Sequence, residues 1–217
     1  MLDVCLKDLF AAEGSDKGCY CPAYEILLRE RRATVRVVLE IGIGTMIPGA
    51  HASMKGYATD DYRPGASLRA WRRYFPHADI IGIDVQPDTQ ISEARIRTFL
   101  CDSTSGPSVE ALRQANLKDT YCDVIVDDGS HRSEDQLRTL ANFFPMLASS
   151  GLYFIEDIGQ GKALYDNYRL VEPIVEGADN FEISDHDPLD GHRWKMIVIQ
   201  GRPGSSSGSS IPRPSLR

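Results

Sequence analysis

Acidic side chains recur where the apolar runs of this sequence end, and they are the residues best placed to do chemistry. Five successive runs end at or near such residues, which are Glu40, Asp84, Asp102, Asp127, Asp128, Glu156 and Asp157. One or two coincidences of this kind are expected by chance, but five are hard to attribute to it. Because ligands of open α/β sheets bind at the carboxyl ends of the strands, the pattern predicts an acid-rich binding crevice.

The glycine turn after the first apolar run is the centre of this pattern. Residues 35–41 are mostly β-branched and apolar, which is typical of a central parallel strand covered on both faces. Gly42 and Gly44 then permit a sharp turn and a close approach of a ligand to the backbone. Glu40 lies inside the run, where a buried carboxylate needs a partner.

The turn does not match the motifs of the common nucleotide sites. Positions 42–47 read Gly-Ile-Gly-Thr-Met-Ile, which lacks the third glycine of the dinucleotide fingerprint, and there is no Gly-Lys-Ser/Thr phosphate loop. A dehydrogenase is therefore a distant alternative, and an ATPase is disfavoured. An acid-rich crevice with few anion-binding elements suits a cofactor without phosphates, such as an adenosine that carries a sulfonium and an amino acid.

Strands and helices alternate around these acids. Further strands are predicted at 80–85, 96–100, 122–129 and 152–157, with a closing pair at 181–184 and 194–200. Helices are predicted at 22–32, 67–75, 107–116, 133–147 and 161–176, whereas residues 1–21 are irregular or weakly helical. We expect Ser133 to cap its helix and Gly151 to break it. The alternation predicts an α/β fold with a mostly parallel sheet and helices on both faces.

The composition is that of an ordinary globular protein. Of the 217 residues, 42% are hydrophobic and 25% charged, so we expect one domain over 1–202, followed by a disordered Gly/Ser/Pro-rich tail at 203–217. The net charge of −7 argues against a nucleic-acid partner. The five cysteines match no zinc-binding spacing, and there is no signal peptide or long apolar run. We therefore expect a cytoplasmic protein with reduced thiols and no membrane partner.

Two polar segments each allow two interpretations. Residues 14–18 read Gly-Ser-Asp-Lys-Gly, which composition alone favours as a surface turn. The alternative is a loop in which Lys17 grips a carboxylate or a phosphate. Residues 45–65 form a long insertion beside the crevice, and we interpret it as a lid over the substrate, a mobile surface loop being the alternative.

Several motifs together resemble a known family. Residues 39–44, Leu-Glu-Ile-Gly-Ile-Gly, with Gly-Ile-Asp at 82–84, resemble the motifs of class I S-adenosylmethionine-dependent methyltransferases. Gly-Ser-Asp-Lys at 14–17, Ser-Leu-Arg at 67–69, Asp-Asp-Gly-Ser-His at 127–131 and Gly-Leu-Tyr-Phe-Ile-Glu-Asp at 151–157 extend the match. These blocks are similar to the macrolide-sugar O-methyltransferases of the mycinamicin and macrocin type and to nucleotide-sugar O-methyltransferases. The resemblance covers roughly residues 14–160.

The resemblance implies a seven-stranded sheet with its last strand antiparallel, and S-adenosylmethionine as cofactor. It implies that Glu40 and the two glycines of the turn line the cofactor. Asp84 then accepts hydrogen bonds from the ribose hydroxyls, as an acid at the end of the second strand does in dinucleotide sites. Asp102 and Ser103 lie near the adenine in this interpretation. The expected cofactor-binding set is completed by Lys17, Ser67, Val85 and Asp127.

The resemblance further implies Mg²⁺ beside the acceptor hydroxyl. Asp128 and Asp157 are its expected ligands, Glu25 is a possible third, and His131 is the expected general base assisted by Asp128. Elementary chemistry agrees with this assignment: a sugar hydroxyl is a very weak acid, a bound cation lowers its pKa, and carboxylate oxygens suit Mg²⁺. A histidine with a pKa of about 6.5 is suited to accept the proton.

The expected activity is O-methylation of a hydroxyl on a sugar or a glycosylated natural product, and two other classes stay open. In a catechol-type enzyme an Asp-Asn pair usually follows the fifth strand, whereas this sequence has Asp157-Ile158. The other alternative is a non-catalytic adenosyl-binding domain. The 45–65 insertion and the lack of the long amino-terminal extension of some members bear on the acceptor and on a possible homo-oligomer, so the acceptor's identity is not carried over.

Overall fold

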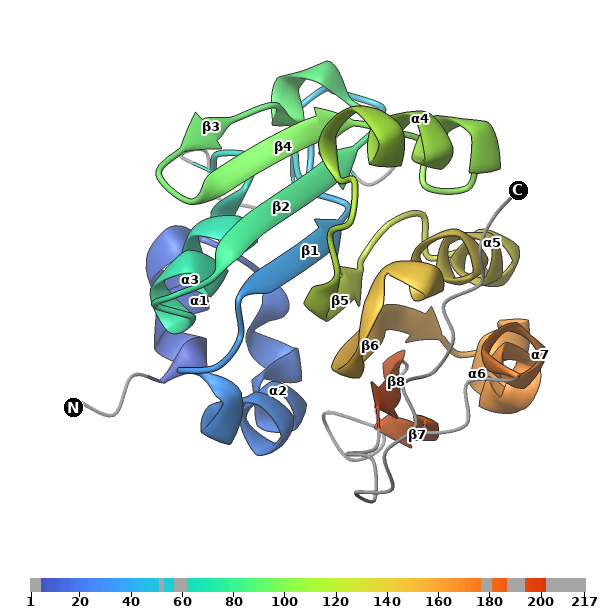
Figure 1. The fold of residues 1–217 in the computed structure, drawn as a ribbon. Coiled ribbons are helices and arrows are strands. Elements are labelled where there is room, and N and C mark those ends of the chain that lie inside the picture. Colours follow the sequence, from blue (N-terminus) through green and yellow to red (C-terminus); the bar gives the residue numbers. More distant parts are fainter. Residues whose placement is uncertain (1–4, 51–52, 57–61, 177–180, 187–193, 202–217) are drawn as a thin grey trace.

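A computed structural model describes residues 5–50, 53–56, 62–176, 181–186 and 194–201 (Figure 1). The expected tail at 203–217 and parts of the 45–65 insertion lie outside these residues. Within the described residues, no helix combines the length and the apolar character needed to cross a membrane.

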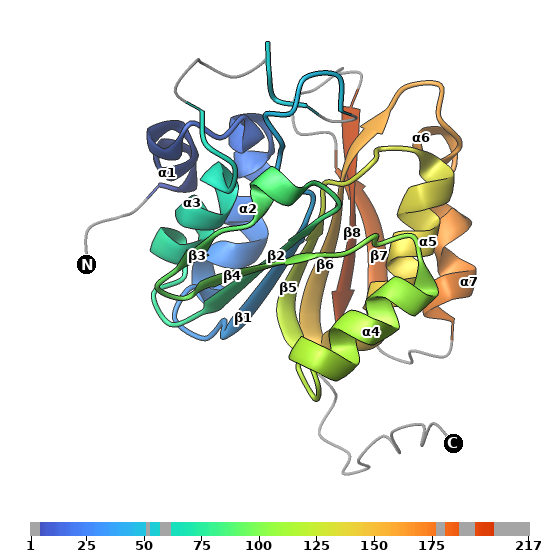
Figure 2. The same cartoon turned by 90° about the horizontal axis from the view of Figure 1, so that it is seen from above.

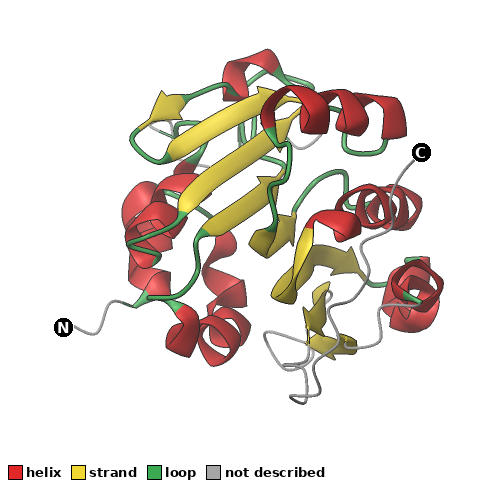
Figure 3. Ribbon diagram, viewed as in Figure 1, coloured by secondary structure: helices red, strands yellow, loops and turns green. Residues whose placement is uncertain are grey.

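One mixed sheet runs through the centre of the molecule (Figure 3). Its strand order is β3-β4-β2-β1-β5-β6-β8-β7. The strands are β1 (Val37–Ile41), β2 (Asp79–Asp84), β3 (Ser92–Glu93), β4 (Ile96–Leu100), β5 (Cys122–Asp127), β6 (Leu147–Gly159), β7 (Phe181–His186) and β8 (Trp194–Gly201). The five strands β4, β2, β1, β5 and β6 are mutually parallel, whereas β8 pairs antiparallel with both β6 and β7.

The expected parallel sheet and the antiparallel last strand are confirmed, and within the part of the chain that the structure describes the sheet has eight strands where seven were expected. The additional strand is the two-residue β3, which pairs antiparallel with the start of β4. Arg95 makes the tight connection possible because its backbone is left-handed, with φ of 61°. Such a short edge strand offers few unpaired backbone groups to other chains.

Helices cover both faces of the sheet, as the alternation predicted. Figure 2 shows α1 (Leu6–Glu13), α2 (Cys21–Leu28) and α3 (Ala66–Tyr74) on one face. The opposite face carries α4 (Gly106–Asn116), α5 (Ser133–Phe143), α6 (Ala163–Asp166) and α7 (Glu172–Val175). Short 3-10 turns complete the chain at η1 (Lys17–Tyr20), η2 (Arg29–Arg31), η3 (Pro87–Thr89), η4 (Phe144–Met146) and η5 (Tyr168–Val171).

The strands build two hydrophobic cores because their side chains alternate between the faces. Val38 and Val124 pack with α1–α3, whereas Leu39 and Ile125 pack with α4–α7. Trp71 is the centre of the first core: it is fully buried, with ring centroids 4.9 Å from Phe10 in an edge-on arrangement. Since both faces of the central strands are covered, the polar groups that remain gather at the strand ends.

Three local predictions were wrong. The amino-terminal segment contains a regular helix, α1, which ends at Gly14 in the left-handed conformation. The helix from Ser133 ends at Phe143, and Gly151 lies within β6, because Leu147 already pairs with Cys122 across an irregular register. The hydroxyl of Ser133 does not cap its own helix but accepts a hydrogen bond from the Leu164 amide.

Candidate active site

A cavity of about 730 Å³ opens at the carboxyl ends of the parallel strands. Its lining contains twelve of the predicted site residues: Lys17, Glu40, Gly42, Gly44, Ser67, Asp84, Val85, Asp102, Ser103, Asp128, His131 and Asp157. Parallel strands all end at the same edge of a sheet, so residues up to 140 positions apart in the chain meet there. The expected crevice is therefore present.

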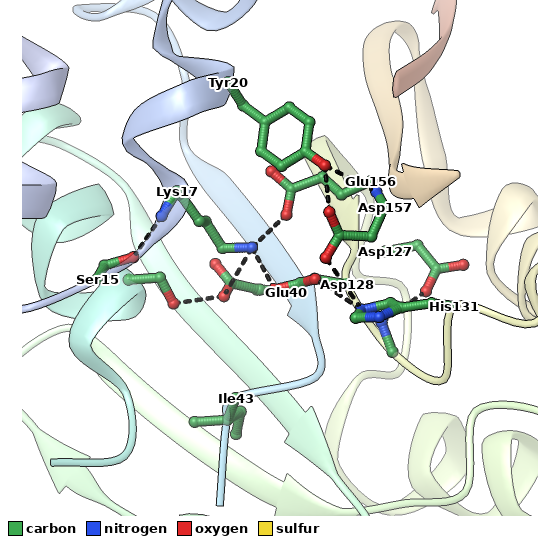
Figure 4. A network of polar contacts seen from close by, with 12 residues as sticks. Ser15, Lys17, Tyr20, Glu40, Ile43, Asp127, Asp128, His131, Glu156 and Asp157 are labelled. Carbon is green, nitrogen blue, oxygen red and sulfur yellow. Dashed lines mark hydrogen bonds and ion pairs between the residues drawn. The ribbon is translucent and has the colours of Figure 1, made fainter. Parts of the chain in front are cut away.

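Asp128, His131 and Asp157, which all line this cavity, form a tight group (Figure 4). Nε2 of His131 lies 3.0 Å from Oδ1 of Asp128 and 3.6 Å from Oδ2 of Asp157. One ligand atom from each of the three residues lies within 4.8 Å of the others. Two carboxylate oxygens and an imidazole nitrogen at these separations are a donor set that suits a divalent cation.

The two later members of the group have unusual backbones. His131 has φ of 58° and Asp157 has φ of 52°, the left-handed region that non-glycine residues rarely adopt. Lys162 donates a hydrogen bond to the His131 carbonyl. Tyr20 donates its hydroxyl hydrogen to Asp157 and accepts from the Asp157 amide at 3.1 Å. Such conformations persist only where surrounding contacts hold them, and they occur often at functional sites.

The charge of His131 depends on the two aspartates. Burial alone would lower the pKa of His131, but the hydrogen bond and charge of Asp128, with the charge of Asp157, raise it to about 9. Burial alone would likewise raise the pKa of Asp128, whereas Lys17 and His131 lower it. Without a bound cation, His131 is thus protonated at neutral pH and forms ion pairs with Asp128 and Asp157.

Behind this group lies a second layer of charge, in which Lys17, Glu40 and Glu156 are buried and Asp128 is partly exposed. The Lys17 ammonium donates to Asp128 and Glu156 and lies 3.9 Å from Glu40, all of them on strand ends. Tyr24 donates its hydroxyl hydrogen to the other oxygen of Glu156. Burial alone would lower the pKa of Lys17, but the surrounding carboxylates raise it well above its usual value. Lys17 therefore stays charged.

Glu40 has the partners that its burial requires. Ser67 donates its hydroxyl hydrogen to Oε1, and the Trp71 indole donates to Oε2 at 2.6 Å. Both donors come from α3, so this carboxylate joins the end of β1 to the helix. Burial raises the pKa of Glu40, and Lys17 and Ser67 oppose that rise.

The glycine turn is required by close packing of the protein itself. A Cβ atom at Gly42 would overlap the carbonyl oxygen of Asp128, and one at Gly44 would overlap the Tyr62 hydroxyl. Both glycines have positive φ, 88° and 85°. Asp84 holds the turn between them, because its Oδ2 accepts from the Ile43 amide at 2.8 Å. The turn thus places Asp128 beside the end of β1.

Comparisons with known proteins agree with this geometry. No protein-family model matches the chain. Over 156 residues, 70% of its length, the chain is 33% identical to 8-demethyl-8-alpha-L-rhamnosyl tetracenomycin-C 2'-O-methyltransferase of Streptomyces olivaceus, of which it covers 37%. It is 32% identical to mycinamicin VI 2''-O-methyltransferase of Micromonospora griseorubida over 139 residues, 64% of this chain and 31% of that protein. The chain thus spans about a third of the length of these relatives.

A solved structure shares the fold over almost the whole chain. It is a methyltransferase from the mycinamycin biosynthetic pathway in complex with Mg, SAH and mycinamycin VI. The TM-score is 0.71 at 23% identity, and the match covers 96% of this chain and 57% of that one. The fold is that of a class I methyltransferase. The resemblance to sugar O-methyltransferases that the motifs indicated is confirmed.

In this methyltransferase fold, the predicted adenosine-side residues lie together along the cavity. Asp84 accepts from the amides of Ile43 and Gln86, both at 2.8 Å, one with each oxygen. Val85, beside it, is 58% exposed, so an apolar face lines this part of the cavity. The Ser103 hydroxyl lies 2.9 Å from the Thr139 hydroxyl.

Two predicted site residues do not reach the cavity. Glu25, the possible third metal ligand, instead accepts from the Leu6 amide at 2.8 Å and from the Tyr74 hydroxyl at 3.1 Å. It faces the contact between α1 and α3, because α2 presents its Tyr24 side, and not Glu25, to Glu156. The tight donor group contains His131 in place of Glu25.

Asp127, expected to bind the cofactor, is the last residue of β5 and is 2% exposed. Its Oδ1 accepts from the Gly129 amide at 3.3 Å, whereas its Oδ2 has no hydrogen-bond partner among the described residues. Burial raises its pKa to about 7. Asp127 and Asp128 are neighbours in sequence, but only Asp128 lines the cavity.

Tyr20 and Lys162 were not found from the sequence. Tyr20 is 137 positions from Asp157, and Lys162 is 31 positions from the carbonyl that it contacts. Neither belongs to a motif that indicates chemistry, and a tyrosine and a lysine are common surface residues. Asp88 was missed for the same reason, although it accepts from the Thr45 hydroxyl at 2.6 Å and from the Met46 amide at 2.8 Å.

Proposed function

We propose that this chain is an S-adenosylmethionine-dependent O-methyltransferase that acts on a sugar hydroxyl of a glycosylated natural product. The observation that carries the proposal is the convergence of Asp128, His131 and Asp157 in a cavity that Asp84 and Val85 also line. The proteins that the chain resembles are named as methyltransferases of rhamnosyl and macrolide substrates. Because the chain spans only part of those relatives, both the activity and the substrate are proposals for this chain.

The donor group fits Mg²⁺. Asp128 and Asp157 supply hard oxygen ligands that are 23% and 32% exposed, so water and an acceptor hydroxyl have room to complete the coordination. Tyr20 fixes one Asp157 oxygen and leaves Oδ2 turned toward the group. When bound, the ion supplies a Lewis acid that lowers the pKa of the acceptor hydroxyl.

In this proposal His131 takes the proton from the acceptor hydroxyl. Its Nε2 faces both aspartates, and the backbone contact from Lys162 holds the loop in place. The imidazole must be neutral to act as a base. A cation bound to Asp128 and Asp157 would weaken the attraction of these carboxylates for the imidazolium. The pKa of His131 would then fall from about 9, which favours the neutral form.

The rest of the cavity fits the proposed cofactor. Asp84 accepts only one amide hydrogen with each oxygen, so each oxygen retains a lone pair for a ribose hydroxyl. Val85 offers an exposed apolar surface to an adenine ring. The carboxylates that line the cavity give it a negative potential, which attracts a sulfonium and disfavours a phosphate group.

A direct test uses the purified chain with labelled S-adenosylmethionine and Mg²⁺. Transfer of the methyl group to a rhamnosyl or other deoxysugar glycoside, abolished by EDTA and restored by Mg²⁺, is the expected result. Transfer only to vicinal phenols would indicate the catechol-type alternative. Tight binding of S-adenosylhomocysteine without transfer to any glycoside or phenol would favour a non-catalytic adenosyl-binding domain. Failure to bind S-adenosylhomocysteine would contradict the proposal outright.

A further inference from the structure

Lys17 has a role that methyl transfer alone does not require. The sequence allowed it to grip a carboxylate or phosphate of a ligand. In the structure its side chain is 3% exposed, and the ammonium faces the protein's own acids (Figure 4). It donates to Asp128 and to Glu156 and lies 3.9 Å from Glu40. Two of its three donor hydrogens are thus used, and the burial of the side chain leaves the ammonium directed at the protein's own acids and not at a ligand.

Asp128 joins this buried charge to the exposed donor group. Its Oδ2 accepts from Lys17, while its Oδ1 lies 3.0 Å from His131. The same carboxylate therefore has one oxygen in each layer. A carboxylate shared between two cations in this way is the arrangement of a two-metal site, in which the ions lie about 3.5–4 Å apart.

The inner layer contains three acids: Glu40 of β1, Glu156 of β6 and Asp128, which directly follows β5 between them. Glu40 and Glu156 are fully buried, and burial raises the pKa of both. Three carboxylates brought so close need a cation or protons, because their mutual repulsion and desolvation are both unfavourable. Carboxylate oxygens in this number would also bind a divalent ion if the ammonium were not there.

We propose that the Lys17 ammonium is the fixed second cation of this centre, and that it limits the centre to one divalent ion. The Lys17 ammonium neutralises the inner acids Glu40 and Glu156 and pairs with one oxygen of Asp128. The exchangeable ion then binds only at Asp128 and Asp157, and His131 beside it keeps its lone pair for the acceptor proton. The inference rests on the metal site of the proposed function, and it makes Lys17 a positioning residue that acts through Asp128.

The test counts Mn²⁺ ions by electron paramagnetic resonance, with Mn²⁺ in place of Mg²⁺. The wild-type chain is expected to bind one ion, and Lys17→Met, which keeps the length but removes the charge, is expected to bind two. Lys17→Arg restores a cation and is expected to return the count to one. Lys118→Met is the control for loss of a positive charge alone. Lys118 is an exposed lysine in the connection between α4 and β5, and this variant is expected to bind one ion.

The possible outcomes separate this inference from the proposed function. A wild-type chain that binds no Mn²⁺ contradicts the metal site of the proposed function. A wild-type chain that binds one ion, together with a Lys17→Met variant that also binds one or none, overturns the role of Lys17 alone. Two ions on the wild-type chain overturn it as well.

The stability of Lys17→Met supplies a second measurement. If the variant folds only when Mn²⁺ is present, with two ions bound, the divalent ion has replaced the ammonium and the inference is supported. If it stays unfolded in saturating Mn²⁺, an ion cannot take the place of Lys17 and the inference is overturned. For a Lys17→Met variant that stays unfolded, the double variant Lys17→Met with Glu156→Gln removes one positive and one negative charge. Recovery of folding in the double variant would show that the unpaired negative charge, and not the loss of the lysine side chain, prevented folding.

Discussion

Oδ1 of Asp128 lies 3.0 Å from Nε2 of His131, and the two residues are three positions apart on the loop that follows β5. The contact depends on the left-handed backbone of His131, with φ of 58°, which turns the imidazole back toward the end of β5. Gly42 contributes on the other side, because only a residue without a Cβ fits against the Asp128 carbonyl. The base and the metal ligand of the proposed function are thus one preorganised unit.

His131→Asn is expected to lower the turnover number by about 10²- to 10⁴-fold, the usual contribution of a general base. Binding of S-adenosylhomocysteine should stay within about twofold, because Asp84 and Val85 are untouched. Turnover and calorimetric binding measure the two effects. His77→Asn, at an exposed histidine outside the cavity, is the control. Turnover within a fewfold of wild type would remove His131 from the mechanism.

The stability of the metal-free protein should fall as the pH rises from about 6.5 to about 9. The folded-state pKa of His131 is raised to about 9 from an ordinary value of 6.5. Its charged form therefore stabilises the fold fully below pH 6.5, and this contribution is lost as the pH passes through 9. Urea unfolding in EDTA at pH 6, 7.5 and 9 is the measurement. The difference between wild type and His131→Asn isolates this group, and parallel pH profiles would contradict the assignment.

Gly42→Ala should be far more disruptive than Gly49→Ala. Both glycines have positive φ, 88° and 76°, so alanine incurs a conformational cost of about 1–2 kcal/mol at either position. Only at position 42 does the new methyl group also overlap backbone, the carbonyl of Asp128, whereas nothing lies within 4 Å at Gly49. We expect an additional loss of about 1–3 kcal/mol for this overlap. Equal losses in urea unfolding would show that the contact with Asp128 is unimportant.

Asp88→Asn should weaken cofactor binding without a comparable change in turnover at saturation. Asp88 accepts from the Thr45 hydroxyl at 2.6 Å and from the Met46 amide at 2.8 Å, so it ties the segment after the glycine turn to η3. An asparagine provides one acceptor oxygen in place of two. Loss of one such hydrogen bond corresponds to roughly a 5- to 10-fold increase in Kd for S-adenosylhomocysteine. Asp79→Asn, at the exposed start of β2, is the control, and an unchanged Kd at position 88 would refute the idea.

Tyr20→Phe should weaken binding of Mn²⁺ by about 10- to 100-fold, as expected when a partner that orients a metal ligand is removed. The hydroxyl is the group that contacts both Oδ1 and the amide of Asp157. Tyr74→Phe removes a buried hydroxyl that contacts Glu25 instead, and should leave the affinity unchanged. If Tyr74→Phe were the variant that lost Mn²⁺, Glu25 would be a ligand after all.

The elements of the sheet were predictable because their signals are local. The runs at β1, β2 and β5 are short and rich in Val and Ile, and an acid or a glycine lies at or near the end of each one. The extra strand β3 was not predictable, since two residues carry no periodicity. The early start of β6 was missed because the pairing of Leu147 with Cys122 is decided by the neighbouring strand.

The site was predictable in part. Glu40, Asp84 and Asp128 were found because each lies at or near the end of an apolar run, and parallel strands bring such positions to one edge. The separation of Asp127 from Asp128 was missed, although alternation along a strand already places adjacent residues on opposite faces. Glu25 does not reach the cavity because α2 turns Tyr24 toward Glu156 and Glu25 toward Leu6, and the resemblance did not indicate which side chain of the helix faces the site.

The sequence by itself determined that the protein is an α/β sheet with an acid-lined crevice, because strand propensity and the position of an acid after a strand are properties of a few neighbouring residues. Only the tertiary structure decided which cation each acid receives. Lys17 pairs with Glu40, Glu156 and Asp128, while Tyr20 and Lys162 contact Asp157 and His131. These contacts join residues 23 to 139 positions apart. Charge is compensated in space, at distances of a few ångströms, and the order of residues along the chain does not record those distances.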